Sequence, residues 1–322
     1  MRKINWGVLG TADIARGQTI PGMAQAENCR LYAIAGRSME KAKAYQAEFG
    51  FEVACDSYDQ LLSDPKVEAV YIPLPNHIHK EWVIRALNAK KHVLCEKPLG
   101  LNAGEVSEMI ACAEDNGVYL MEAFAYLHSP LTAAIRAELP RLGKILYMDS
   151  CFVTSVPNAA NIRMHRETGG GSVYDLGCYS LSQMQWMLGE PETVQAVADF
   201  TDCHIDTCAS GVLTFPGGAR ATLACGMTLR EKTGGRIDRC LIHGEKGYIV
   251  NNCEFNQCGE LQYTVCVDGV CETKTVPTPN NYRLEVEQLG RCIADGEKPF
   301  VSNAFSLQNA RVIDRVLADM GY

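Results

Sequence analysis

The first third of the chain alternates short apolar runs with segments that favour helices, and this alternation restricts the possible folds more than any other feature. The compact apolar runs, which we expect to form strands, are residues 4–9, 30–35, 67–72, 92–95 and 119–122. The segments between them predict helices, one starting at Asp13 and the others at residues 38–49, 79–89 and 103–116. Such alternation builds βαβ units, so residues 1–122 are predicted to form a doubly wound parallel sheet of the Rossmann type.

The pattern changes after residue 122. Apolar stretches become short and bounded by turn signals such as Asp268-Gly269, and the expected strands are residues 145–153, 193–200, 209–215, 220–225 and 248–250. Helices are expected at residues 131–139, 283–294 and 305–320. Residues 123–322 are therefore predicted to form a second α/β domain with a mostly antiparallel sheet, which we expect to bind the substrate.

The composition is that of an ordinary globular protein with room for two domains: 322 residues, 47% hydrophobic and 21% charged. A formal net charge of −8 argues against binding to nucleic acid or to an anionic membrane. The chain has no run of apolar residues long enough to span a bilayer. Its first residues enter an expected core strand without an apolar signal region, so we expect a cytoplasmic protein.

Fifteen cysteines are many for this length, and without an export signal free thiols are the default expectation. Four of them form a cluster whose members are Cys253, Cys258, Cys266 and Cys271. Four thiolates can bind zinc, but structural zinc sites use more closely spaced pairs. The Asp268-Gly269 hairpin turn places Cys266 directly across from Cys271. We therefore favour packed or neighbouring thiols over a metal site and expect no bound metal.

A degraded dinucleotide-binding fingerprint follows the first expected strand. The usual pattern is G-x-G-x-x-G, and this chain has Gly10, Ala12 and Ala15 in its place. Small residues there let a pyrophosphate approach the amides of the helix N-terminus. A plain turn between strand and helix is the competing interpretation, and the βαβ context favours the nucleotide site. The residues expected to contact the cofactor here are Gly10, Thr11, Ala12, Asp13 and Ile14.

Arg37 lies at the end of the second expected strand, where NAD-binding chains usually place Asp or Glu. Its guanidinium can pair with a 2′-phosphate and stack on adenine, and Ser38 and Lys41 can assist. A solvated surface arginine is the alternative. The sequence therefore predicts NADP as the cofactor, with NAD as the second possibility.

Two further segments carry residues suited to chemistry. Glu96 and Lys97 end the strand at residues 92–95, at the sheet edge where ligands bind, although a surface ion pair would look the same. The glycine triplet at residues 169–171 leads into a helical run in which Asp175 and Tyr179 are four apart and share a face. A carboxylate beside a phenol can transfer protons to and from a substrate. The alternative interpretation is structural, in which these residues belong to a capped and partly buried start of a helix.

These motifs together resemble the glucose–fructose oxidoreductase and inositol dehydrogenase (Gfo/Idh/MocA) family. The resemblance covers the whole chain through the Gly10 to Ala15 opening, the Pro-Asn-His-Ile-His segment at residues 75–79, the Glu-Lys-Pro tripeptide at residues 96–98 and the GGGxxxDxGxY motif at residues 169–179. Tyr179 stands where other branches carry His. This tyrosine and the compact length look most like the dimeric dihydrodiol dehydrogenase and aldose dehydrogenase branch.

The resemblance implies a large open sheet in the second domain, often used for dimer contacts, and a homodimer is expected. It implies that Lys97 lies near the nicotinamide, that Tyr179 is the catalytic acid/base, and that Asp175 and Arg163 contact the substrate side. A loop with Leu74, Pro75, Asn76 and His79, followed by Glu96 and Lys97, is expected to line the cofactor. The chain departs from the family around residues 122–130, where an arginine is missing and His128 is displaced. The resemblance therefore does not define the residues of the substrate-side wall, which bears on specificity more than on the chemistry.

The resemblance predicts an enzyme that transfers a hydride between NADP(H) and a hydroxyl or carbonyl carbon of a sugar, polyol or cyclic diol. Two other functions stay open. One is a non-redox sugar-modifying enzyme, a glycosidase or epimerase, that uses tightly bound NAD for transient oxidation. The other is a nucleotide-sensing binding protein without turnover, which would need neither Lys97 nor Tyr179.

Overall fold

The structure is a computed structural model that describes residues 2–156, 158–229 and 235–322. The chain forms two compact units. The first contains the residues up to His128 together with Pro279–Leu307, and the second contains Ser129–Thr278 and Gln308–Tyr322. A single cut after residue 122 does not describe this return of the chain to the first unit.

The first unit is built on a six-stranded sheet in the order β3-β2-β1-β4-β5-β6, and every strand pair is parallel. Its strands are β1 (Ile4–Leu9), β2 (Cys29–Ala35), β3 (Val53–Cys55), β4 (Ala69–Ile72), β5 (His92–Glu96) and β6 (Leu120–Ala123). The order reverses between β1 and β4, and ligands of such sheets bind beyond the carboxyl ends of the strands at this point. The predicted Rossmann-type sheet is confirmed.

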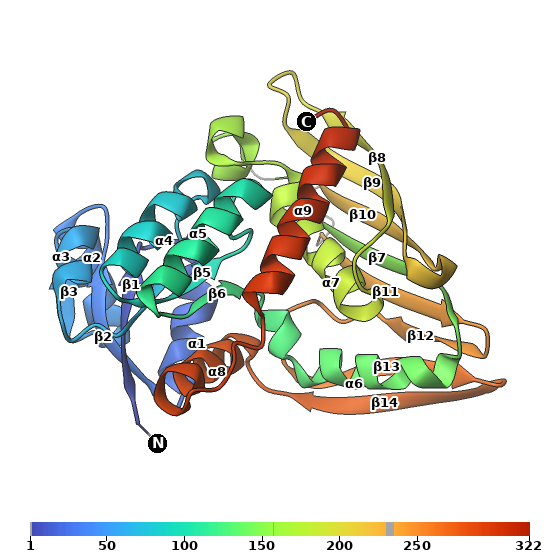
Figure 1. Ribbon diagram of the computed structural model, residues 1–322, viewed down its shortest axis with the longest axis horizontal. Coiled ribbons are helices and arrows are strands. Elements are labelled where there is room, and N and C mark those ends of the chain that lie inside the picture. Colours follow the sequence, from blue (N-terminus) through green and yellow to red (C-terminus); the bar gives the residue numbers. More distant parts are fainter. Residues whose placement is uncertain (1, 157, 230–234) are drawn as a thin grey trace. The chain divides into compact units, whose positions relative to one another are not determined.

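Helices cover both faces of this sheet, as its fully buried strands require. In Figure 1, α4 and α5 lie on one face, while α1 and α8 lie on the other. The helices are α1 (Ile20–Gln25), α2 (Met39–Phe49), α3 (Tyr58–Ser63), α4 (His79–Asn88), α5 (Ala103–Asn116) and α8 (Asn281–Asp295). Ser38 caps α2 by accepting the Lys41 N–H, which explains why that helix begins where the sequence suggested.

The second unit is built on an eight-stranded sheet in the order β14-β13-β12-β11-β7-β10-β9-β8. The pairs are antiparallel except for β7 with β10. The strands are β7 (Ile145–Ser155), β8 (Thr193–Phe200), β9 (Asp206–Thr214), β10 (Arg220–Leu229), β11 (Arg236–Gly244), β12 (Gly247–Asn251), β13 (Gly259–Val267) and β14 (Val270–Thr278). The predicted large, mostly antiparallel sheet is confirmed.

One face of this sheet carries the helices α6 (Pro130–Glu138), α7 (Cys178–Leu188) and the C-terminal part of α9 (Asn303–Asp319) (Figure 1). Strand residues that alternate toward the helices, such as Leu213, Leu223 and Ile242, are buried. Residues that alternate to the other face include exposed apolar side chains. Among these are Val197 and Ile237.

The expectation that all cysteines are free thiols is wrong for one pair. Cys266 and Cys271 face each other across the β13–β14 hairpin, as the Asp268-Gly269 turn predicted, and they form a disulfide. Directly paired strand positions bring two β-carbons close enough for this bond. Cys253 and Cys258 are not disulfide-bonded. Within the described ranges, no group of three or more metal-ligating side chains lies close enough together to hold a metal ion.

Two elements differ from the sequence expectation in their winding. The helices that follow the Gly10 loop and the glycine triplet begin with π-helical turns, Ala15–Thr19 before α1 and Val173–Gly177 before α7. The sequence carries no signal for such turns, which are frequent at functional sites. No helix in the described part of the chain has the length and apolar character needed to cross a bilayer.

Candidate functional site

The first candidate loop connects β1 to the helix that follows it, and Gly10 is its pivot. Gly10 has φ +126°, a conformation that suits glycine, and its N–H donates to Ala35 O at 2.8 Å. A β-carbon here would lie 3.1 Å from the Leu74 side chain, so the position must stay small. Thr11, Ala12 and Ile14 are half-buried along the loop, and Asp13 is exposed. The loop thus has the narrow, glycine-dependent form that a pyrophosphate requires.

Arg37 is exposed just beyond the carboxyl end of β2, with Ser38 and Lys41 beside it. The charge of Arg37 acts on the Tyr58 phenol, where it opposes the rise in pKa that burial of Tyr58 causes. The Tyr58 hydroxyl lies 3.8 Å from the position that a β-carbon on Gly10 would take. Tyr58, which the sequence did not suggest, therefore lies between the glycine loop and the region of Arg37.

His79 joins two loops that the resemblance assigned to the cofactor. It is completely buried at the start of α4, its Nε2 lies 2.7 Å from Leu74 O, and its Nδ1 lies 2.9 Å from Pro98 O. Burial lowers the pKa of His79, and the two carbonyl oxygens oppose this shift. Both ring nitrogens are engaged with backbone, so His79 holds the loops and is not placed to exchange protons with a substrate. Pro75 and Asn76 are half-buried on the same loop.

Glu96 is the last residue of β5, and its carboxylate is hydrogen-bonded to the first of two linked, buried hydroxyl groups. Tyr71 OH lies 2.6 Å from Glu96 Oε1, and Thr19 Oγ1 lies 2.9 Å from Tyr71 OH. Glu96 Oε2 accepts the Lys97 N–H at 3.3 Å. Lys97 is half-buried, and the bond between Lys97 and Pro98 is cis. Glu96 is thus a structural partner of β4, and Lys97 begins a sharply turned segment at the carboxyl edge of the sheet.

Glu122 lies at the same edge, on β6, and was not singled out from the sequence. Its Oε1 accepts the Leu99 N–H at 2.9 Å. Burial raises the pKa of Glu122 to about 7, while Ser306, Leu99 and the charge of Lys97 act in the opposite direction. His128, the displaced histidine, is half-buried beside the Phe300 ring, with ring centroids 5.3 Å apart. Loss of solvent around the imidazole lowers the pKa of His128 to about 3, which favours its neutral form.

In the second unit, backbone hydrogen bonds hold the glycine triplet against the preceding turn. Gly170 N donates to His165 O and Gly171 N donates to Arg163 O. Asp206 on β9 is completely buried, and its Oδ2 accepts from Ser172 Oγ at 2.7 Å and from Val173 N at 2.8 Å. Asp206 therefore caps the helical run from a distant strand.

Arg163 and Asp175 are brought together by this turn. Arg163 Nε lies 2.6 Å from Asp175 Oδ2, and the carboxylate side chain is largely buried. Asp175 lies in the π-helical turn, whereas Tyr179 lies in α7, so the α-helical spacing argument does not describe their relation.

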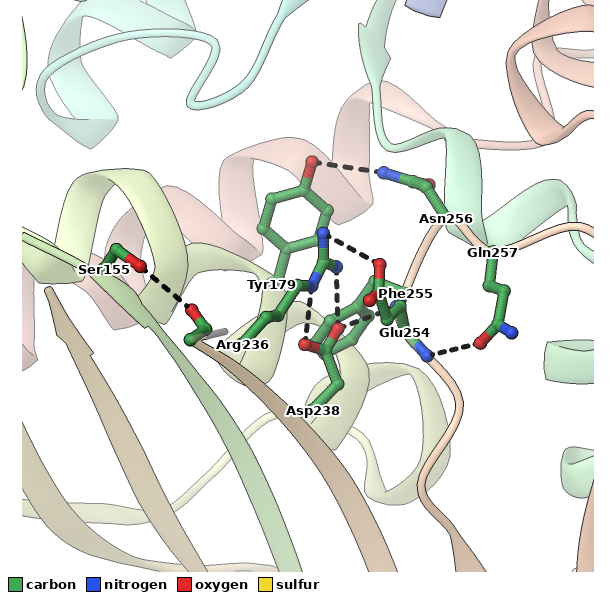
Figure 2. A network of polar contacts seen from close by, with 9 residues as sticks. Ser155, Tyr179, Arg236, Asp238, Glu254, Phe255, Asn256 and Gln257 are labelled. Carbon is green, nitrogen blue, oxygen red and sulfur yellow. Dashed lines mark hydrogen bonds and ion pairs between the residues drawn. The ribbon is translucent and has the colours of Figure 1, made fainter. Parts of the chain in front are cut away.

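Tyr179 is surrounded by residues of β11 and of the β12–β13 loop, as Figure 2 shows. Its hydroxyl lies 3.5 Å from Asn256 Nδ2. Its ring contacts those of Phe255 and Phe152, with centroids 5.2 and 5.5 Å away. Tyr179 is only 8% exposed. An aromatic wall thus holds the ring, while the hydroxyl faces a polar amide.

A cation lies beside this wall. Arg236 makes two 2.7 Å hydrogen bonds to Asp238 and an ion pair with Glu254 at 3.3 Å (Figure 2). Its guanidinium also stacks over the Phe152 ring, 4.5 Å from the centroid. Burial acts to lower the pKa of Arg236, but Asp238 and Glu254 outweigh it and the pKa is raised. Asp238 also accepts the Phe255 N–H at 2.8 Å, which fixes the loop.

Sequence reasoning missed this loop and its anchor because their contacts with Tyr179 join segments that are far apart in the chain. The one available signal was the polar pair Arg236 and Asp238 on the helix-facing side of β11. Polar residues at inward strand positions are uncommon unless they are paired.

Comparisons with known proteins place this geometry in a family. The model of an oxidoreductase family with an NAD-binding Rossmann fold matches residues 4–124. The model of the GFO/IDH/MocA C-terminal domain matches residues 132–250. The chain belongs to the Gfo/Idh/MocA oxidoreductase family. The predicted family and enzyme class, a dehydrogenase or reductase acting on CH–OH or C=O groups, are thereby confirmed.

Individual relatives are named dehydrogenases or reductases, in agreement with this enzyme class. D-xylose 1-dehydrogenase (NADP(+)) 2 of Haloferax volcanii is 38% identical over 97% of this chain and 95% of its own length. Trans-1,2-dihydrobenzene-1,2-diol dehydrogenase of Xenopus tropicalis is 29% identical over 98% of both chains. A 3-ketoreductase from Actinomadura kijaniata, solved with NADP and TDP-benzene, is 29% identical over 99% of this chain and 98% of its own, with a TM-score of 0.92. The cofactor prediction, NADP, agrees with the first and third of these relatives.

Proposed function

We propose that this enzyme transfers a hydride between NADP(H) and a hydroxyl or carbonyl carbon of a sugar, polyol or cyclic diol, with Tyr179 as the acid/base. The observation that carries the proposal is the setting of Tyr179. Its hydroxyl faces a polar amide, and its ring is fixed between Phe152 and Phe255. A rigidly held phenol with a polar partner suits proton exchange with a substrate oxygen.

The first unit fits a dinucleotide, as the form of its glycine loop indicates. Gly10 adopts φ +126°, and a β-carbon there would crowd Leu74, so the loop leaves space that a larger residue would fill. Thr11, Ala12, Asp13 and Ile14 would meet the pyrophosphate. Leu74, Pro75 and Asn76 would line the nicotinamide side. When bound, the nicotinamide supplies the hydride acceptor or donor.

The adenosine end favours NADP over NAD. Arg37 supplies a guanidinium where a carboxylate would select NAD, and Lys41 adds a second exposed cation nearby. The Ser38 hydroxyl is engaged in capping α2, so we assign it a smaller part than the sequence suggested. Tyr58 interacts with Arg37 and lies close to Gly10, which makes it a further residue of this subsite.

Proton transfer is assigned to Tyr179 with help from Lys97. A tyrosine with an ordinary pKa of about 10 is a poor base at neutral pH. A nearby cation favours the tyrosinate, and we assign this task to the Lys97 ammonium. In the oxidation direction Tyr179 takes the substrate hydroxyl proton, and in reduction it returns a proton to the carbonyl oxygen. Solved variants of the 3-ketoreductase from Actinomadura kijaniata include replacements of a tyrosine and of a lysine.

Substrate binding is assigned to the polar groups around Tyr179 and the glycine triplet. The Asn256 amide and the Arg236 guanidinium can hold hydroxyl groups, and Arg163 with Asp175 forms a second polar pair. Several hydrogen-bonding groups beside an aromatic wall suit a polyhydroxylated ring. The relatives named for sugars or cyclic diols support this choice.

We also propose a homodimer through the open face of the second-unit sheet. Four exposed apolar side chains alternate to that face, namely Val197, Val212, Ile237 and Tyr248. An apolar sheet face needs a covering layer, and a second copy of the chain supplies one of matching shape.

A panel of aldoses, inositols and cyclic diols, each incubated with NADP⁺ or NADPH, tests the reaction. We expect a change in NADPH absorbance with at least one of these compounds. Conversion of a sugar without any net change in NADPH would replace this proposal with transient oxidation by a bound cofactor. Tight NADPH binding without turnover of any compound would favour a nucleotide sensor.

A further inference from the structure

The segment that carries Lys97 is fixed by buried side chains from two different elements. His79 Nδ1 of α4 lies 2.9 Å from Pro98 O, and Glu122 of β6 accepts the Leu99 N–H at 2.9 Å. His79 is completely buried and Glu122 is 3% exposed. The two residues after Lys97 are thus held by one polar contact each, and neither contact is open to competition from solvent.

Glu122 does more than accept a backbone hydrogen bond. Its surroundings contain one cation and one anion, Lys97 and Glu96, and the hydroxyl of Ser306 from the start of α9. A neutral side chain could also accept the Leu99 N–H, so that contact does not by itself require a carboxylate. An ionised group in this buried place is stabilised by a nearby cation, and here the cation is the Lys97 ammonium.

We propose that Glu122 is a positioning residue for Lys97, acting as its buried counter-charge and as the anchor of the segment that follows it. The inference rests on the proposed function, because it concerns the lysine assigned to assist Tyr179. Ionised Glu122 attracts the Lys97 ammonium and restricts where that charge lies. Its protonation removes the counter-charge and leaves the Leu99 contact in place.

Glu285 provides a contrast within the same unit. It lies on α8, is completely buried and interacts with Glu96. Neither of its carboxyl oxygens has a hydrogen-bond partner among the described residues. Burial and the Glu96 charge raise the pKa of Glu285 well above its usual value, which favours the protonated, neutral form. Replacement by glutamine therefore preserves the charge at Glu285 and removes a charge at Glu122.

The experiment compares Glu122→Gln with Glu285→Gln in the full-length enzyme, using a substrate that the unmodified enzyme turns over. We expect Glu122→Gln to lower kcat about tenfold to a hundredfold, the effect of a lost interaction with a charged group. NADPH affinity, measured by fluorescence titration, should stay within about twofold, because Glu122 is not expected to touch the cofactor. Glu285→Gln should leave kcat and NADPH affinity unchanged, and Glu122→Asp should recover part of the rate.

The pH profile separates positioning from a merely structural role. Because burial raises the pKa of Glu122 to about 7, activity should rise with pH through this region in the unmodified enzyme. This rise in activity with pH should be absent in Glu122→Gln. Ser306→Ala removes a hydroxyl that lowers the Glu122 pKa. In this variant, the rise in activity should therefore occur at higher pH. This variant also tests the inference if Glu122→Gln does not fold.

Specific outcomes would overturn the inference. One is a Glu122→Gln enzyme with unchanged kcat and pH profile. Another is an equal loss of kcat in Glu122→Gln and Glu285→Gln. A third is a Ser306→Ala enzyme whose activity rises at the same pH as that of the unmodified enzyme. Failure of the proposed function is a separate result, because it would show as near-normal turnover by Tyr179→Phe. If Tyr179→Phe is impaired and Glu122→Gln is not, only the role of Glu122 is wrong.

Discussion

The carboxylate of Asp206 occupies the space that a β-carbon on Gly171 would need. Gly171 also has φ +111°, a conformation that side chains other than glycine rarely adopt. Asp206 is buried and fixed by Ser172 and Val173, so it cannot move aside at low cost. The glycine triplet next to Asp175 is thus shaped by a carboxylate from a strand far away in the sequence.

This relationship predicts a large cost for Gly171→Ala. We expect a loss of about 2–4 kcal/mol in the free energy of unfolding, from backbone strain and overpacking together. Urea denaturation measures it. Gly217→Ala is the control, because Gly217 has φ +81° with no atom near its β-carbon position, and only about 1–2 kcal/mol of strain is expected there. Equal losses in the two variants would show that Asp206 does not shape the turn.

Arg37 is predicted to determine cofactor choice. The unmodified enzyme should bind NADPH more tightly than NADH, and Arg37→Ala should remove about tenfold to a hundredfold of this preference, as expected for a charge-assisted hydrogen bond. Arg30→Ala is a matched control, since Arg30 is an exposed arginine near the start of β2, away from the carboxyl end of the strand, and pairs with Glu52. Equal affinity for both cofactors in the unmodified enzyme would refute the assignment.

Glu285 is predicted to make stability depend on pH. Its pKa is raised in the folded protein, so it binds a proton that it releases on unfolding once the pH exceeds its unfolded value of about 4.3. The free energy of unfolding should therefore fall with rising pH, by up to about 1.4 kcal/mol per pH unit from this group. Glutamine does not titrate, so Glu285→Gln should gain stability relative to the unmodified protein between pH 5 and pH 8, about the range in which carboxyl groups are normally ionised. Parallel stability curves would contradict this.

The open sheet face is predicted to form a dimer. Val197→Asp places a charge on that face and should shift light-scattering mass from dimer to monomer. Val270→Asp is the control, because Val270 is about equally exposed, at 65% against 69%, and alternates to the other face. A monomeric unmodified protein at micromolar concentration would exclude the interface.

Local sequence signals predicted much of the fold. Strand β1 and helix α5 coincide with the expected segments, because buried apolar runs and helix-forming composition act over short range. Ser38 marked the start of α2, and Asp268-Gly269 fixed the pairing of Cys266 with Cys271. The bond between those two cysteines was missed because the expectation came from the cellular compartment rather than from strand register.

The candidate site was only partly predictable. Motif positions marked Lys97 and Tyr179 as candidates. Asn256 reaches Tyr179 from 77 residues away, and Asp206 reaches Ser172 from 34 residues away. Such contacts depend on how β9, β11 and the β12–β13 loop pack, which no local pattern encodes. The π-helical turns are likewise set by tertiary packing.

The most direct test of the central claim is the kcat of Tyr179→Phe with a substrate of the unmodified enzyme. Phenylalanine keeps the ring that packs on Phe152 and Phe255, so folding and NADPH binding should survive. We predict that kcat falls by ~10²–10⁴, the usual contribution of general acid–base catalysis. Lys97→Met should lose a comparable amount, and the double variant should be little worse than either single one, because the proposed mechanism has the two residues act as one unit. Near-normal turnover by Tyr179→Phe would contradict the assignment and require another proton carrier.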